Sequence, residues 1–164
     1  MRIVGGMFRG SLLALAISIL ISEGVGMLSA LFSMGTMEKY QDLIQPSFSP
    51  PGWVFPIAWG ILYLLMGIAS YLVYSSGADK KEIKNALSFY ALQLIFNFFW
   101  TIIFFRLDLR GFAFLWIIAL LILIIITTVK FYKINKTAGY LMIPYILWVS
   151  FASVLNFAIW QLNR

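Results

Sequence analysis

The side chains that could do chemistry in this sequence are aromatic rings, amides and carboxylates, because the commonest catalytic and metal-binding types are missing. The chain of 164 residues contains no histidine and no cysteine. A disulfide framework and a thiolate nucleophile are therefore excluded, as are the commonest general base and the commonest metal ligand. We expect no metal site. Chemistry would have to use tryptophan, tyrosine, amide or carboxyl groups, or be done by a bound ligand.

Aromatic and amide side chains recur at helical spacing in three segments. Residues four apart share one face of a helix. The three faces carry Phe55, Trp59 and Tyr63; Gln93, Asn97, Trp100 and Phe104; and Trp148, Ala152, Leu155, Asn156 and Ile159. If these faces converge, they enclose an aromatic-lined pocket with a few polar groups, which suits a flat apolar ligand. The alternative is a packed aromatic core without a cavity.

Glu23 is the one carboxylate that lies well inside an apolar segment. An ionisable group within a membrane span is a candidate functional residue by default. If the first helix ends early, however, Glu23 lies at the membrane surface instead. Both interpretations stay open, and we assign no catalytic role to Glu23.

The composition shows which elements must position these side chains. Hydrophobic residues make up 62% of the chain and charged residues 11%, against roughly 45–50% and about 25% in soluble proteins. Crossing a bilayer takes about 20 apolar residues in a helix. We predict an all-α membrane protein, a single domain over residues 1–164 that forms a bundle of five transmembrane helices. The predicted helices cover residues 8–32, 51–74, 83–105, 111–132 and 138–162.

Small residues and prolines give local detail within these helices. A stripe of small side chains in the first helix favours close approach of a neighbour: Ser18, Ser22, Gly26 and Ala30. Pro51 suits the first turn of the second helix, and Pro144 should kink the fifth. Three connections are short, so neighbouring helices should be antiparallel. The long connection from about Ser33 to Pro50 is a candidate lid or binding loop.

The net charge of +6 indicates membrane orientation rather than nucleic-acid binding. One side of the predicted bundle carries Arg2, Arg9, Lys80, Lys81, Lys84, Lys130, Lys133 and Lys136. The other side carries Lys39, Arg106, Arg110 and Arg164. The excess of cations on the first side predicts a cytoplasmic N-terminus. We expect a multi-pass protein of the cell membrane, with lipid and no nucleic acid among its partners.

Several ordered motifs resemble those of the TspO/MBR family, which includes the translocator protein (the peripheral-type benzodiazepine receptor) and the tryptophan-rich sensory proteins. The segment from Gln45 to Trp59 is similar to the family signature K-P-x-[WF]-x-P-P-x-W-x-F-x-x-x-W. Further matches are Leu62-Tyr63, Met66-Gly67, Tyr90, Gln93-Leu94, Asn97, Pro144-Tyr145, Trp148, Phe151-Ala152 and Leu155-Asn156. Departures are Gln45 for a usual lysine, Lys39-Tyr40 for a Trp-Tyr pair, and Phe157 for a tyrosine of the animal cholesterol motif.

The resemblance implies a five-helix bundle, often a homodimer, whose ligand cavity opens toward the loop between the first two helices. It implies binding of protoporphyrin IX or a related tetrapyrrole, and of benzodiazepine-type ligands, with no required cofactor. The positions that match the family's ligand site are Trp59, Tyr63, Asn97, Trp100, Trp148, Ala152 and Leu155, and Phe55 shares their aromatic face. Trp59 and Trp148 match tryptophans implicated in porphyrin breakdown.

Two functions follow from these observations. The first is a membrane protein that binds tetrapyrroles as a sensor or transporter. Metal-free porphyrin fits better than haem, because a haem iron would find no imidazole or thiolate in this chain. The second is an enzyme that degrades porphyrin with light or oxygen, with Trp59 and Trp148 as tentative catalytic residues. Because no acid–base pair supports ordinary turnover, binding is the preferred interpretation.

Overall fold

The computed structural model describes residues 10–164, and within them five helical segments are long and apolar enough to cross a membrane. This confirms the predicted fold class. The segments are α2 (Leu12–Phe32), α4 (Val54–Tyr74), α5 (Lys80–Thr101) with the π-helix η1 (Ile102–Arg106), α6 (Arg110–Ile134), and α7 (Lys136–Leu141) with α8 (Ile143–Leu162). The predicted start of the first helix at residue 8 lies outside the described residues.

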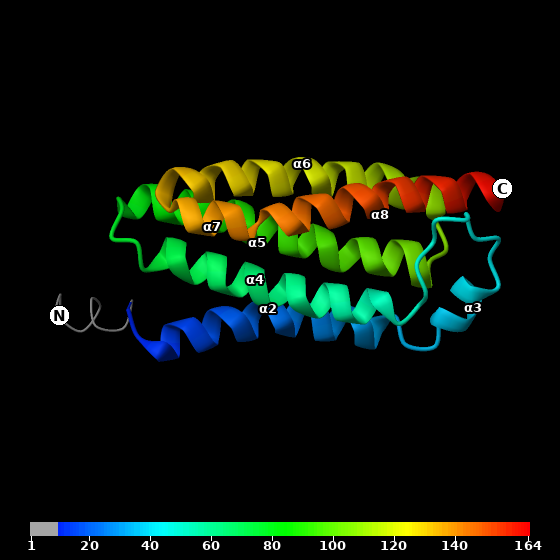
Figure 1. Cartoon of the computed structure of the whole chain (residues 1–164), viewed down its shortest axis with the longest axis horizontal. Helices are drawn as coiled ribbons and strands as arrows, with labels where there is room; N and C mark the ends of the chain where they lie inside the picture. The colour runs from blue at the N-terminus through cyan, green and yellow to red at the C-terminus, as the bar shows by residue number, and fades with distance from the viewer. Residues whose placement is uncertain (1–9) are drawn as a thin grey trace.

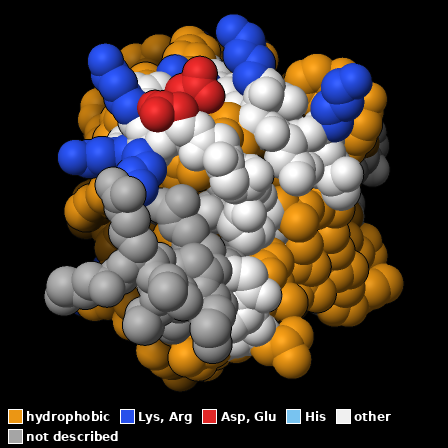
Figure 2. Space-filling model, turned by 90° about the vertical axis from the view of Figure 1, so that its left-hand side faces the viewer, with side chains coloured by type: hydrophobic (Ala, Val, Ile, Leu, Met, Phe, Trp, Pro, Cys, Tyr) orange, Lys and Arg blue, Asp and Glu red, His pale blue; other side chains and the backbone are white. Residues whose placement is uncertain are grey.

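The long helices lie side by side as an antiparallel bundle (Figure 1). The most extensive contacts join α2 to α4, α5 to α6, and α6 to α8. The α4–α5 and α6–α7 connections lie at the end of the bundle where α2 begins (Figure 1). Figure 2 looks onto that end and shows Lys and Arg side chains around it, with hydrophobic side chains along the flank. The long connection, with the short helix α3 (Met37–Gln41), lies at the opposite end beside the C-terminus.

The predicted stripe of small residues in the first helix brings α2 and α4 close together. The hydroxyl of Ser22 donates a hydrogen bond of 2.7 Å to the backbone carbonyl of Tyr63. From the other side, a Cβ on Gly67 would lie 2.6 Å from the Cα of Ile19. Such a distance leaves no room for a side chain at Gly67, so the two backbones meet directly, as small residues in membrane helices allow.

The prediction for Pro51 is wrong, because α4 begins at Val54. Pro51 belongs to the preceding turn, where its carbonyl accepts a hydrogen bond of 3.0 Å from the Val54 N–H. Pro56 occupies the first turn of α4 instead. The first N–H groups of a helix have no partner within the helix, so a proline there removes no helical hydrogen bond.

The expected kink at Pro144 takes the form of a break. The predicted fifth helix is divided at Met142 into α7 and α8, and Pro144 lies in the first turn of α8. The Met142 N–H donates to the carbonyl of Gly139 at 3.1 Å, which closes α7. Because the first N–H groups of a helix have no partner within it, the missing N–H of Pro144 removes no hydrogen bond from α8.

The third span changes its helical geometry before it ends. After Thr101 the backbone widens into η1, where the Leu107 N–H donates to the carbonyl of Ile102 at 3.0 Å. A π-helical turn rotates the following side chains relative to an α-helix, and such turns are frequent at functional sites. Here it lets Phe104 and Phe105 both contact Tyr40 of the long connection. The sequence pattern gave no indication of this change.

Candidate functional site

A cavity of about 590 Å³ lies between α2, α4, the end of α5 with η1, and α8, beneath the long connection. Its volume falls within the range of roughly 300–1,000 Å³ that is usual for small-molecule sites. The wall is predominantly apolar and aromatic, with residues 33–37 and Tyr40 of the long connection at one end. The cavity is the feature that distinguishes a ligand pocket from a fully packed aromatic core.

Trp59 lies at the centre of the aromatic wall. Its ring centroid is 5.7 Å from that of Tyr63 on the same helix. The centroid of Trp100 from α5 lies 6.4 Å away, and that of Trp148 from α8 lies 6.5 Å away with the ring planes at 88°. Three helices therefore direct indole rings to one place, in the tilted and edge-to-face arrangements that aromatic rings prefer.

Seven of the eight side chains predicted to bind ligand line this cavity: Phe55, Trp59, Tyr63, Trp100, Trp148, Ala152 and Leu155. Their role toward a ligand stays a prediction. Asn97 is not part of the lining. It is buried on α5 one turn before Trp100, and its side chain faces the interior of the bundle.

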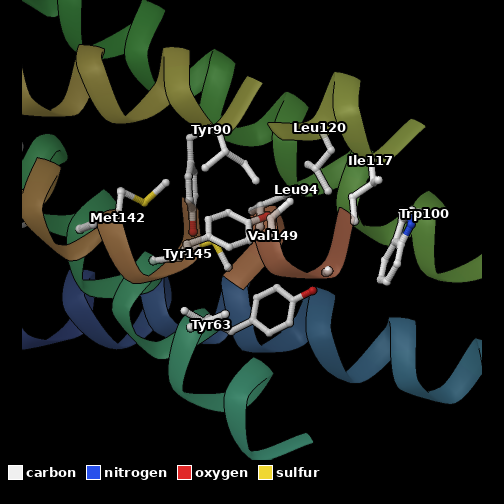
Figure 3. Close-up of a cluster of buried hydrophobic side chains, with 14 of the residues drawn as sticks. Tyr63, Tyr90, Leu94, Trp100, Ile117, Leu120, Met142, Tyr145 and Val149 are labelled. Atoms are coloured by element: carbon white, nitrogen blue, oxygen red, sulfur yellow. The ribbon is translucent and has the colours of Figure 1, made fainter. Parts of the chain in front are cut away.

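The amides of α5 find their partners across the bundle rather than in the cavity. The Tyr145 hydroxyl accepts a hydrogen bond of 2.7 Å from Asn97 Nδ2 and donates one of 2.7 Å to Gln93 Oε1. Gln93 Nε2 contacts the sulfur of Met66 at 3.7 Å. Figure 3 shows Tyr145 between Tyr63 and Tyr90 in the middle of the bundle. Polar groups in an apolar interior need such partners, so this cluster fixes the core behind the cavity.

Trp100 is held in the wall by a second chain of hydrogen bonds. Its Nε1 donates to Asn156 Oδ1 at 3.2 Å, and Asn156 Nδ2 donates to the carbonyl of Arg110 at 2.9 Å. One amide thus joins α5, α6 and α8. Because its indole N–H is already occupied, Trp100 presents the cavity with an oriented ring rather than a free donor.

Trp148 separates the cavity from a second hollow on the outside of the bundle. It lines both the inner cavity and an apolar groove of about 510 Å³ between α4 and α8. The groove also includes Leu62, Leu147 and Phe151. The Trp148 Nε1 is buried and has no hydrogen-bond partner among the described residues. The Trp148 side chain therefore lies between the inner cavity and the outer groove.

The long connection closes one end of the cavity as an ordered lid. The Gln45 side chain donates to the carbonyl of Tyr40 at 2.8 Å and accepts from the Ser49 hydroxyl at 2.9 Å. An amide can do both, whereas the lysine usual in the resembling family can only donate. Burial raises the pKa of the Tyr40 hydroxyl above its ordinary value, so this phenol stays neutral.

The lid is also attached to the end of α8. Ile44 and the Asn163 side chain exchange two hydrogen bonds, one from the Ile44 N–H to Oδ1 at 2.9 Å and one from Nδ2 to the Ile44 carbonyl at 3.0 Å. The amide of Asn163 thus pairs with the backbone N–H and carbonyl of Ile44 as the backbone of a neighbouring β-strand would. Sequence reasoning did not find it, because the two residues are 119 positions apart.

The structure decides between the two interpretations of Glu23. Helix α2 continues without interruption to Phe32, so Glu23 lies near the middle of a membrane-length helix and not at its end. Its side chain lines the cavity together with Gly26, Met27 and Ala30. Sequence reasoning treated this face of the first helix as packing alone. Gly26 and Met27 follow Glu23 by three and four positions, and this helical spacing was the signal that the same face of α2 also lines a cavity.

Known proteins resemble this chain over most of its length. The sequence model of the TspO/MBR family matches residues 18–161. The tryptophan-rich protein TspO of Chlorobaculum tepidum is 37% identical over 153 residues, covering 93% of this chain and 97% of that protein. The tryptophan-rich protein TspO of Archaeoglobus fulgidus is 38% identical over 154 residues, covering 93% and 99%. The human translocator protein is 35% identical over 126 residues, covering 76% and 75%.

Proposed function

Because this chain belongs to the TspO/MBR family, we propose that its aromatic cavity binds a flat apolar tetrapyrrole, with protoporphyrin IX as the expected ligand. The observation that carries the proposal is the convergence of Trp59, Trp100 and Trp148 on one cavity. Ring faces and edges from three helices offer a planar macrocycle stacking and edge contacts over much of its surface.

The same cavity also suits smaller aromatic ligands of the benzodiazepine type. Ala152 and Leu155, on the same helix as Trp148, add small and aliphatic side chains to the wall, so apolar contacts alone would hold a compact ligand. The names of two relatives, translocator protein and tryptophan-rich sensory protein, agree with a transporter or a sensor. In either role, the first step is saturable binding in the cavity.

We also propose that the protein lies in the cell membrane with a cytoplasmic N-terminus. The cation-rich connections share the end of the bundle shown in Figure 2, which is the distribution expected for a cytoplasmic side. The lid and the cavity would then face the exterior. We also propose a homodimer, which rests on the family and on the broad apolar flanks of the bundle.

The test is a titration of the purified protein with protoporphyrin IX in the dark, followed by intrinsic tryptophan fluorescence. Saturable quenching at micromolar ligand is expected. Trp59→Ala and Trp148→Ala should each weaken binding about fivefold to a hundredfold, because a lost stacking contact is worth roughly 1–3 kcal/mol. Trp53→Ala is the matched control, since this side chain is 66% exposed and does not line the cavity. Binding that is indifferent to both cavity tryptophans would reject the proposal.

The alternative function is light-dependent porphyrin degradation. Trp59 and Trp148 both line the cavity with ring centroids 6.5 Å apart, so a bound porphyrin would contact both. One indole would give an electron to the photo-excited porphyrin and would take it back after dioxygen has added across a methine C=C bond of the macrocycle. Cleavage of the O–O bond and of that C–C bond would then leave two carbonyl groups and open the ring. If Trp59→Phe and Trp148→Phe lose porphyrin under light as fast as the wild type, photochemistry of free porphyrin explains the loss. Trp160→Phe, outside the cavity lining, is the control.

A further inference from the structure

The described wall of the cavity contains a single charged side chain, and it is an acid. Glu23 lines the cavity near the middle of α2, and no lysine or arginine is found among the described residues of the lining. The described cations lie in the connections and near the ends of the spans. The electrostatic character of the cavity is therefore set by one carboxylate that faces an otherwise apolar and aromatic space.

Glu23 has no stabilising partner within the part of the chain that the structure describes. Among residues 10–164, the ion pair joins Arg110, at the start of α6, to Asp108, and no hydrogen bond involves the Glu23 side chain. An ionised carboxylate in a membrane interior is costly unless it is paired. Because the side chain faces the cavity, the partner that the carboxylate lacks can come from a ligand.

Aromatic rings lie beside the carboxylate. Gly26 is one turn beyond Glu23 on the same face of α2, and a Cβ at Gly26 would lie 2.6 Å from two ring carbons of Tyr63. The Tyr63 ring therefore lies directly against this face of α2, with Trp59 next to it at 5.7 Å. A carboxylate together with aromatic rings attracts an organic cation, through a charged hydrogen bond and through the ring quadrupoles.

We propose that the cavity binds flat aromatic ligands that carry a protonated amine, with the ammonium group on Glu23 and the apolar body among Trp59, Tyr63 and Trp148. This inference rests on the proposed use of the cavity as a ligand site and adds a second ligand class. It also orients a tetrapyrrole. The carboxylates of protoporphyrin IX must point away from Glu23, because like charges in this apolar space repel.

The test compares three probes that share one ring system and differ in charge. They are 1-pyrenemethylamine, a cation at neutral pH; 1-pyrenemethanol, its neutral counterpart; and 1-pyrenecarboxylate, an anion. Binding to the full-length protein in detergent is followed by energy transfer from tryptophan to pyrene. The wild type should bind the amine about tenfold to a hundredfold more tightly than the alcohol, since a hydrogen bond to a charged group contributes that much. The anion should bind least.

Glu23→Gln should bring the affinities for the amine and the alcohol to within about twofold, while the alcohol binds as it does to the wild type. The unchanged alcohol affinity reports that the cavity is intact. Glu38→Gln is the matched control, because Glu38 is exposed on α3 and does not line the cavity. It should retain the full preference for the amine.

An amine preference that survives Glu23→Gln would overturn the proposal, and so would equal binding of the amine and the alcohol by the wild type. Loss of both probes in Glu23→Gln would also count against it, since Glu23 would then support the fold rather than recognise a charge. Protoporphyrin IX is titrated on the same preparations. If it fails to bind while the amine preference depends on Glu23, the tetrapyrrole function falls and the amine site stands.

Discussion

The Tyr145 hydroxyl of α8 accepts a hydrogen bond of 2.7 Å from Asn97 Nδ2 of α5, in the middle of the helix bundle. The same hydroxyl donates to Gln93 Oε1 at 2.7 Å, so one phenol serves both amides of α5. Trp59 packs edge-on against the Tyr145 ring with centroids 6.2 Å apart. The buried polar cluster therefore supports the back of the aromatic wall directly.

Tyr145→Phe should lower the free energy of unfolding by about 1–3 kcal/mol, because it leaves a buried amide donor and acceptor without partners. The measurement is thermal unfolding of the purified protein in detergent. Tyr71→Phe, at a half-buried position on α4, is the control, since its hydroxyl forms no hydrogen bond within the described residues. Equal stability of the two variants would show that the cluster contributes nothing to the fold.

Gly67→Ala should destabilise the contact between α2 and α4. The added Cβ would lie 2.6 Å from the Cα of Ile19, and backbone cannot rotate away as a side chain can. Overpacking of this kind costs about 1–3 kcal/mol. Gly60→Ala on the same helix meets nothing within 4 Å and should leave the melting temperature unchanged or slightly higher. Similar melting temperatures for the two variants would contradict the close approach.

Gly26→Ala should weaken ligand binding in the cavity more than it lowers the stability of the helix bundle. Its Cβ would lie 2.6 Å from two carbons of the Tyr63 ring, so this ring, which lines the cavity, would have to move. We expect about tenfold weaker binding of protoporphyrin IX or 1-pyrenemethanol with a smaller change in melting temperature. Gly24→Ala, two residues earlier on α2, meets nothing within 4 Å and should bind as the wild type does. Unaltered binding by Gly26→Ala would mean that Tyr63 does not border the ligand.

Asn163→Ala should loosen the lid. It removes both hydrogen bonds between the Asn163 side chain and Ile44, each worth about 0.5–1.5 kcal/mol before solvent exposure weakens them. Ligand dissociation and protease cleavage between residues 33 and 53 should become about threefold to tenfold faster. Gln161→Ala, in the same turn of α8, is the control. If both rates stay at their wild-type values, the Asn163 contact does not control access to the cavity.

The number of spans and the faces of the helices were predictable because both depend on local sequence. Lengths of apolar sequence set the five spans, and spacing of four residues placed Phe55, Trp59 and Tyr63 on one face. The errors in placing helix starts lie at prolines. Pro51 and Pro56 are five positions apart, and either can stand at a helix start; the turn that the chain makes before Val54 decided between them.

The sequence by itself determined that this chain is a bundle of membrane-length helices and that Trp59, Trp100 and Trp148 lie on inward faces, since apolar length and helical period act within each segment. Only the tertiary structure decided what those faces enclose. Whether rings fill a space or border it depends on the distances between helices, such as the close approach of α2 and α4 at Gly67. The pairing of Asn97 with Tyr145, and the exposure of Glu23 to the cavity, depend on contacts between segments distant in the chain, which no local pattern encodes.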